Sequence, residues 1–260
     1  MTPQKTIFIT GAASGIGRAT AELFVKRGWY AGLFDISEPQ LEALAKTLGK
    51  DSCCFRRMDV TDMESVTAAA SFFEQATGGK MDALFNNAGV LSMGPYQRIS
   101  VEVHKKIVDV NINGILNCTH ACLELLRGTA GSRIINMSSA SSIYGTPELA
   151  VYSATKFAVR GLTEALNIEF QPLGITVSDI MAAYVRTPMI TEARVQATSV
   201  GRMGIRLEPA DVAEVVWKAA HGNRVHWRVG LLLDLIVFFS WLLPFTRKTT
   251  TRWLAFSTRQ

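Results

Sequence analysis

Short apolar runs typical of β-strands alternate with helix-like segments along almost the whole chain. The strand-like runs are TIFIT (6–10), YAGLFD (30–35), CCFRRMDV (53–60), MDALFNN (81–87), RIINMSS (133–139), ITVSDIM (175–181) and RVHWRV (224–229). The helix-like segments lie at about 14–27, 38–49, 62–77, 100–127, 150–171 and 208–221. Strands joined by helices of this length predict a parallel sheet with helices on both faces, so the expected fold class is α/β.

One domain is the simplest organisation for this sequence. The chain has 260 residues, of which 48% are apolar and 19% are charged, so it can bury a sizeable core. No internal repeat, low-complexity segment or linker is visible. We expect a single domain over residues 1–230, followed by an apolar and basic tail over residues 231–260.

The formal charge of +5 is unevenly distributed. From Arg224 onward there are six Lys and Arg residues but one acid, Asp234, so the rest of the chain is balanced. A general nucleic-acid-binding surface is therefore disfavoured. The apolar run near the N-terminus is too short for a signal peptide, and the four cysteines form no plausible disulfide framework, so we expect a cytoplasmic protein.

No metal site is expected. The stretch CTHAC contains Cys118, His120 and Cys122, which are the residue types that bind zinc. On a helix, however, the central residue of such a stretch points away from the two outer ones.

A glycine-rich loop, TGAASGIG (10–17), follows the first strand and opens the first helix. Glycines allow a tight turn and close backbone approach, and a helix N-terminus offers free N–H groups to a pyrophosphate. The alternative is an ordinary glycine-rich turn, but the strand–loop–helix setting favours phosphate binding. The predicted cofactor contacts in this loop are Gly11, Ser14, Gly15, Ile16 and Gly17.

Asp35 ends the second strand and favours NAD(H) over NADP(H). A carboxylate at this place can accept hydrogen bonds from an adenosine ribose hydroxyl, and it would repel a 2′-phosphate. Neither Ser14 nor Ile36 supplies a positive charge that would offset this repulsion. The alternative is a solvated aspartate at a strand end.

Several short motifs follow one another along the chain in the order that is typical of one enzyme family. Through them the chain resembles the short-chain dehydrogenase/reductase family over about residues 5–222. The matching pieces are TGAASGIG (10–17), Asp35, DVTD (59–62), NNAG (86–89), Asn111, Ser139, YSATK (152–156) and VRTPM (185–189). The resemblance implies a doubly wound, Rossmann-like three-layer sandwich with a seven-stranded parallel sheet, assembled as a homodimer or homotetramer. It also implies cofactor contacts at Asp59, Val60, Asn87, Ala88, Gly89, Val185 and Thr187.

Tyr152 and Lys156 lie one helical turn apart in YSATK, so their side chains are neighbours. Taken alone, Tyr152 and Lys156 are also consistent with two amphipathic side chains on the solvent-exposed face of a helix. A free tyrosine has a pKa near 10, too high for a base at neutral pH. A cation about 5 Å away contributes roughly 3 kcal/mol at an effective dielectric constant of about 20, which predicts that Lys156 lowers the pKa of Tyr152. Tyr152 is then the general acid/base, and both residues also contact the cofactor.

Ser139 and Asn111 complete the expected catalytic set. Ser139 ends the fifth strand, where its hydroxyl can orient the substrate oxygen and stabilise developing charge. The resemblance implies that Asn111 bends its helix and holds a water that relays protons to Lys156. Taken singly, these residues are also consistent with a strand-end turn and a kinked helix.

The substrate side of the expected site is less sharply defined. Many family members have Pro-Gly where this chain has Ala182-Ala183, which puts the shape of that loop in question. Tyr184 either faces the substrate or fills the loop. Met93 and Tyr184, together with Ser139 and Tyr152, are the expected substrate contacts, and apolar residues nearby favour a hydrophobic alcohol or ketone.

The tail contains VGLLLDLIVFFSWLLPF (229–245), interrupted by Asp234 and Pro244 and too short to cross a bilayer. Three alternatives remain open: it packs in a subunit interface, lies in a membrane surface, or caps the substrate entrance. The leading function is an NAD(H)-dependent oxidoreductase acting on an alcohol or ketone. The alternatives are a non-catalytic NAD-binding sensor or scaffold and an NADPH-dependent carbonyl reductase.

Overall fold

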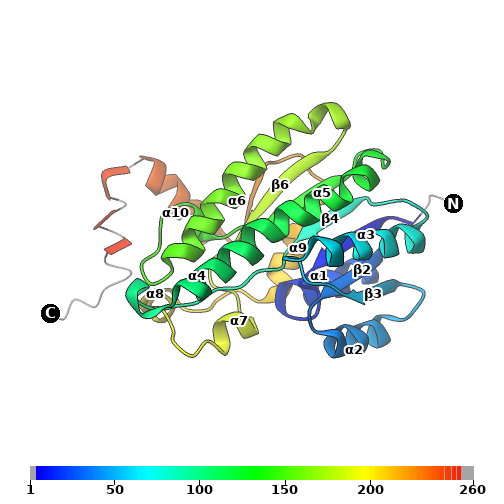
Figure 1. Cartoon of the computed structure of the whole chain (residues 1–260). Coiled ribbons are helices and arrows are strands. Elements are labelled where there is room, and N and C mark those ends of the chain that lie inside the picture. The colour runs from blue at the N-terminus through cyan, green and yellow to red at the C-terminus, as the bar shows by residue number, and fades with distance from the viewer. Residues whose placement is uncertain (1–3, 243, 247, 250, 253–260) are drawn as a thin grey trace.

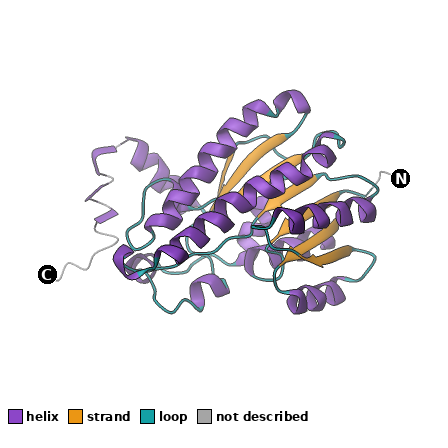
Figure 2. Ribbon diagram, in the orientation of Figure 1, coloured by secondary structure: helices purple, strands orange, loops and turns teal. Residues whose placement is uncertain are grey.

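The computed structural model describes residues 4–242, 244–246, 248–249 and 251–252. Within these residues, seven parallel strands form one sheet in the order β3-β2-β1-β4-β5-β6-β7 (Figure 2). The strands are β1 (Thr6–Thr10), β2 (Tyr30–Asp35), β3 (Cys53–Arg57), β4 (Ala83–Asn86), β5 (Arg133–Met137), β6 (Thr176–Met181) and β7 (His226–Arg228). The order reverses direction between β1 and β4, which makes the carboxyl ends of these strands the switch point of a doubly wound sheet.

Helices cover both faces of the sheet (Figure 1). They are α1 (Gly15–Lys26), α2 (Glu38–Leu48), α3 (Met63–Thr77), α4 (Val101–Val108), α5 (Gly114–Arg127), α6 (Ala150–Glu169), α7 (Pro188–Thr191), α8 (Thr198–Met203), α9 (Pro209–Ala219) and α10 (Leu231–Leu242). Short 3-10 turns lie at Tyr96–Arg98, Ala140–Ser142, Gln171–Leu173 and Pro244–Thr246. The expected three-layer α/β architecture is confirmed.

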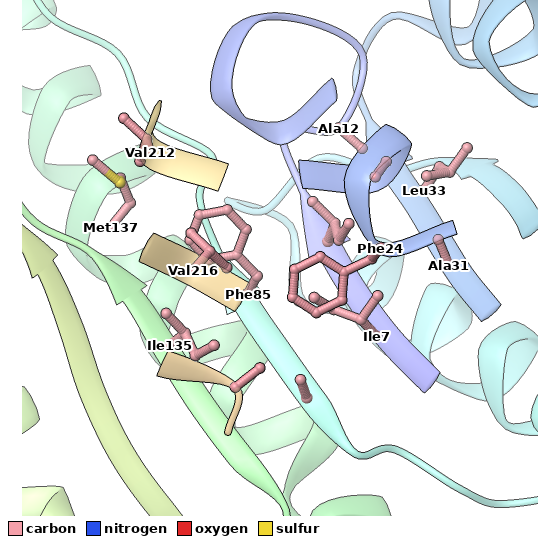
Figure 3. Close-up of a cluster of buried hydrophobic side chains, with 14 of the residues drawn as sticks. Ile7, Ala12, Phe24, Ala31, Leu33, Phe85, Ile135, Met137, Val212 and Val216 are labelled. Carbon is pink, nitrogen blue, oxygen red and sulfur yellow. The ribbon is translucent and has the colours of Figure 1, made fainter. Parts of the chain in front are cut away.

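Strand residues alternate between two buried clusters, as the two-residue period of a strand requires. Ile7 and Ile9 of β1 face a cluster with residues of α1, α2 and α9, whereas Phe8 faces a second cluster with α3 and α5. Figure 3 shows the first cluster, in which Phe24 and Val216 lie over the sheet. Because both faces are buried, the strands read as nearly continuous apolar runs.

Several strands are shorter than expected, and two elements differ for a clear structural reason. The third strand ends at Arg57 rather than at residue 60, because the Asp59 carboxylate accepts hydrogen bonds from the backbone N–H and hydroxyl of Thr61 and turns the chain. The long helix expected over 100–127 contains a π-helical turn, Asp109–Asn113, between α4 and α5. Such turns interrupt a helix by one extra residue and often occur at functional sites.

The segment that connects β6 to α9 begins at the carboxyl end of β6. The chain between β6 and α9 forms α7 and α8, which we name the lid (residues 188–203). It is held to the body by a bridge between Val185 and Leu207 and by an ion pair between Arg186 and Glu208 at 2.7 Å. The tail forms α10, which Figure 1 shows at one end of the molecule, near one end of α6.

Candidate active site

A cavity of about 1120 Å³ runs along the carboxyl ends of the strands, from the glycine loop to α6. Most of the predicted site residues line it: Gly11, Ser14, Gly15, Ile16, Asp35, Asp59, Val60, Asn87, Ala88, Gly89, Ser139, Tyr152, Lys156, Tyr184, Val185 and Thr187. Gly17, Asn111 and Met93 do not line it. The volume exceeds what a drug-sized ligand requires, so it can hold a dinucleotide and a second molecule together.

The glycine loop has the shape that its composition predicts. Gly11 adopts φ 65°, in the left-handed region that favours glycine, and a Cβ there would lie 2.9 Å from the backbone of Ala88. Gly15 has φ 52°, and a Cβ would lie 3.0 Å from the methyl group of Thr187. The loop therefore leaves bare backbone on the cavity wall, against the start of α1, as pyrophosphate binding requires.

Gly17 and Asn87 support the loop from behind. A Cβ on Gly17 would lie 2.1 Å from the carbonyl oxygen of Gly11, so only glycine fits. The amide of Asn87 donates to the carbonyls of Thr10 at 2.9 Å and of Gly11 at 3.1 Å. Gly17 therefore shapes the loop. The side-chain NH2 group of Asn87 is bonded to the loop backbone, so Asn87 also holds the loop in place.

Asp35 lies where a nucleotide ribose would have to be held. Its carboxylate accepts hydrogen bonds from the backbone N–H of Ala13 at 3.1 Å and of Ser37 at 3.0 Å, which fixes its position. Ile36, exposed beside it, also lines the cavity. A carboxylate at one end and open glycine backbone beside it fit an adenosine diphosphate group, so the residues present are suited to a nicotinamide dinucleotide.

Ser139, Tyr152 and Lys156 converge at the other end of the cavity. The hydroxyl of Ser139 lies close enough to the phenol of Tyr152 to act on its pKa, and both side chains line the cavity. The ammonium of Lys156 lies 5.5 Å from the centre of the Tyr152 ring and donates to the carbonyl of Met137 at 2.7 Å. The Ser139 hydroxyl also accepts from the backbone N–H of Ser141 at 3.1 Å, which fixes its direction.

The expected lowering of the tyrosine pKa is not found in the protein alone. Burial raises the pKa of Tyr152 to about 12, and the hydrogen bond from Ser139 only partly opposes it. Burial also lowers the pKa of Lys156 to about 8. The expected lowering took account only of the attraction between the charges of Tyr152 and Lys156. Both groups also lose water on burial, and this desolvation has the larger effect on their pKa values.

Asn111 has its side chain behind the cavity wall, within the π-helical turn. Its Oδ1 accepts from the backbone N–H of Val90 at 2.8 Å, and its Nδ2 donates to the carbonyl of Val90 at 3.0 Å and to the hydroxyl of Thr155 at 3.2 Å. The π-helical turn interrupts the helix at this residue, and the expected role of Asn111 in holding a water stays a prediction. Because both polar atoms are engaged, Asn111 ties the segment after β4 to α6 and so positions Lys156.

On the substrate side, Met93 and Tyr184 lie in different surroundings. Met93 lies in a buried cluster beneath the lid, with Leu149, Ile190, Ala197 and Val200, and its sulfur accepts from the backbone N–H of Ala197 at 3.2 Å. Tyr184 does line the cavity, and its hydroxyl pairs with that of Ser199 at 2.6 Å. Burial raises the pKa of Tyr184, so this phenol stays neutral at physiological pH.

The segment Ala182-Ala183 forms an ordered wall without left-handed backbone. Ala182 is buried, and its carbonyl accepts from the backbone N–H of Ala140 at 2.9 Å. Ala183 lines the cavity. The loop therefore holds its shape without the Pro-Gly pair found in many members of the family.

Some residues of the site escaped sequence reasoning. They are Glu102, Lys105 and Lys106, which line the cavity, and Glu148, which holds the lid. Glu148 has φ 65°, rare for a residue other than glycine, and its carboxylate accepts from the backbone N–H of Thr198 at 2.6 Å. No short motif marks these positions, because they reach the cavity only through tertiary packing.

Buried Lys156 gives the protein a pH-dependent stability. Its pKa falls from 10.5 to about 8 on folding, so between these values the unfolded chain binds more protons and stability rises with pH. Relative to Lys156→Met, the wild type is expected to gain about 2 kcal/mol of unfolding free energy from about pH 7 to about pH 9.5. Urea denaturation of both proteins measures this difference. For Lys46→Met, at an exposed lysine, the unfolding free energy should change with pH as it does in the wild type. If Lys156→Met also followed the wild-type pH dependence, the burial of the Lys156 charge would be contradicted.

Comparisons with known proteins agree with this geometry. Residues 5–198 match the short chain dehydrogenase family. The chain is 37% identical to the oxidoreductase UcpA of Salmonella typhimurium, over 83% of this chain and 80% of that protein. It is 31% identical to a cyclohexanol dehydrogenase of Acinetobacter sp., over 82% of this chain and 86% of that protein. A short chain dehydrogenase/reductase of Burkholderia phymatum, solved in complex with NAD, superposes with a TM-score of 0.83 at 26% identity, covering 95% of this chain and 97% of that one.

Proposed function

The chain belongs to the short-chain dehydrogenase family and is an oxidoreductase, and from this membership we propose that it interconverts a secondary alcohol and a ketone of a hydrophobic compound with NAD(H). One observation carries the proposal: Ser139, Tyr152 and Lys156 share a single cavity with the glycine loop and Asp35. A nicotinamide cofactor supplies a hydride acceptor or donor when it is bound there. The rest of the chemistry falls to the side chains of this chain.

Tyr152 is the group that exchanges a proton with the substrate oxygen. Ser139, which lines the same part of the cavity as Tyr152, donates to the same oxygen and stabilises charge as it develops. The ammonium of Lys156 lies close enough to favour the ionised phenol during turnover. Asn111 and the carbonyl of Met137 hold Lys156 and its helix in place.

Asp35 supports NAD(H) over NADP(H), and Asp35→Asn tests it. The substitution keeps the side-chain size but removes the charge that would repel a 2′-phosphate. We expect the ratio of NADPH to NADH affinity to rise by at least about tenfold, since a pair of charges about 4 Å apart interacts by roughly 4 kcal/mol near a protein surface before screening. Fluorescence titration with both nucleotides measures the ratio. Asp51→Asn, at an exposed aspartate before β3, should leave the ratio of NADPH to NADH affinity unchanged. Tighter binding of NADPH than of NADH by the wild type would overturn the assignment of NAD(H) as the cofactor.

A hydrophobic substrate is supported by the wall around Tyr152. Leu91, Ile143, Leu149, Tyr184 and Met203 line this part of the cavity. The similar Acinetobacter protein is named a cyclohexanol dehydrogenase, which also handles an apolar secondary alcohol. A panel of short secondary alcohols, steroids and long-chain hydroxyacyl compounds distinguishes the substrate classes.

A homodimer or homotetramer and a cytoplasmic location are also proposed. Val108, Leu116 and Phe157 leave apolar side chains exposed on α4, α5 and α6, on one side of the sheet. All four cysteines are buried thiols, as expected in a reducing compartment. The alternative function, a non-catalytic NAD sensor, is not favoured because the full set of Ser139, Tyr152 and Lys156 is kept together at one place.

A further inference from the structure

α10 carries an exposed apolar stripe, which we define as Leu231, Leu235, Phe238 and Leu242. These side chains are 74%, 45%, 52% and 51% exposed, and Phe245 just beyond them is 77% exposed. Their spacing keeps all four within about 60° around the helix axis. Adjacent apolar side chains on one helix face are unusual on a protein surface and mark a binding face.

The exposed charged residues that follow the stripe in the described sequence are positive. The acid in α10, Asp234, is neutralised by an ion pair with Arg228 at 2.6 Å. Lys248 and Arg252, in the segments that follow α10, are both exposed. An apolar helix face next to exposed bases is complementary to a bilayer surface with anionic headgroups.

The same helix is a wall of the active-site cavity. Leu233, on the opposite side of α10 from the stripe, is buried, and Leu233 and Leu235 line the cavity that contains Tyr152. Thr246 and Thr251 line it as well. α10 therefore carries both the exposed stripe and part of the cavity wall, and Leu235 belongs to both.

We propose that α10 lies in the surface of an anionic bilayer and that the enzyme takes its hydrophobic alcohol or ketone from that bilayer into the cavity beside α10. The substrate part rests on the proposed function; the membrane contact does not. None of the helices within the described residues can cross a bilayer, and α10 with 12 residues is about 18 Å long against a hydrocarbon core of about 30 Å. A stable protein interface buries about 800 Å² on each partner, which one stripe on a short helix does not offer. A membrane surface is therefore the occupant that fits.

Cosedimentation of the full chain with lipid vesicles tests the proposal. The wild type is expected to pellet with vesicles containing phosphatidylserine and to bind phosphatidylcholine vesicles more weakly. The triple variant Leu231→Gln, Leu242→Gln, Phe245→Gln should lose at least about tenfold in vesicle affinity, because it removes apolar surface that would leave water. Lys248→Gln with Arg252→Gln should lose about tenfold, and only on anionic vesicles. Val101→Gln with Ile168→Gln, at exposed apolar residues elsewhere, is the matched control.

Activity separates the two parts of the proposal. The triple variant should turn over a water-soluble secondary alcohol at the wild-type rate, but should act more slowly on a long-chain secondary alcohol dissolved in vesicles. Wild-type protein that stays in solution with both kinds of vesicle overturns the membrane contact. So does a lower oligomeric mass of the triple variant in gel filtration together with no vesicle binding, which would identify a second copy of the chain as the occupant. NADH titration of the same samples reports separately on the proposed function.

Discussion

Replacing Tyr152 by Phe is expected to lower kcat by about 10³-fold, while NADH affinity changes by less than about twofold. The ring and its packing remain, but the hydroxyl that exchanges a proton with the substrate oxygen is lost, and general acid–base catalysis contributes about 10² to 10⁴ in rate. Steady-state kinetics with an identified alcohol, together with NADH fluorescence titration, measure both quantities.

Tyr184→Phe is the matched control for this change. Tyr184 is a second phenol in the same cavity, and its hydroxyl pairs with Ser199 rather than with Ser139. Its substitution should alter KM more than kcat, since it changes the wall and not the proton exchange. Full turnover by Tyr152→Phe, or an equal loss of kcat in both variants, would contradict the role given to Tyr152.

Gly17→Ala is expected to reduce NADH affinity by at least about 100-fold, the second large effect. The new Cβ would lie 2.1 Å from the carbonyl oxygen of Gly11 and 2.7 Å from the amide nitrogen of Asn87, so the glycine loop must move. A shift of the backbone that faces the pyrophosphate removes hydrogen bonds to charged groups, worth about 1.5 to 3 kcal/mol each. Isothermal titration with NADH measures the loss.

The control for this substitution is Gly161→Ala on α6. A Cβ at Gly161 meets nothing within 4 Å, so this variant should bind NADH as the wild type does and gain about 0.5 to 1 kcal/mol in stability. Thermal unfolding, followed by circular dichroism, shows whether Gly17→Ala is folded. A folded Gly17→Ala protein with wild-type NADH affinity would contradict the assignment of the loop.

The fold could be predicted because its signals are local. Each buried strand is a short apolar run, and the glycine loop and Asp35 stand at places where a doubly wound sheet brings strand ends together. The pairing of Tyr152 with Lys156 followed from helix geometry, which the structure confirms. Asn111 lies in the π-helical turn that interrupts its helix.

The remaining features depend on tertiary structure. Desolvation raises the pKa of Tyr152, and its extent depends on the residues that close the cavity, which adjacent sequence does not reveal. The sequence left open whether Tyr184 faces the substrate or fills its loop; in the structure Tyr184 lines the cavity, whereas Met93 packs beneath the lid. Three alternatives for the tail followed from the sequence: a subunit interface, a membrane surface or a cap over the substrate entrance. In the structure α10 forms part of the cavity wall, which agrees with the cap. It also carries an exposed apolar stripe, from which we propose the membrane contact.

The most direct measurement of the central claim is the transfer of a labelled hydrogen. The wild-type protein is incubated with NAD and with each secondary alcohol of the panel, deuterated at the carbon that bears the hydroxyl, and the nicotinamide product is examined by mass spectrometry. We predict that an apolar alcohol yields NADH that carries one deuterium, together with the matching ketone. NADH without deuterium, or no NADH from any alcohol of the panel although NAD binds, would contradict the assignment of the chain as an NAD-dependent alcohol oxidoreductase.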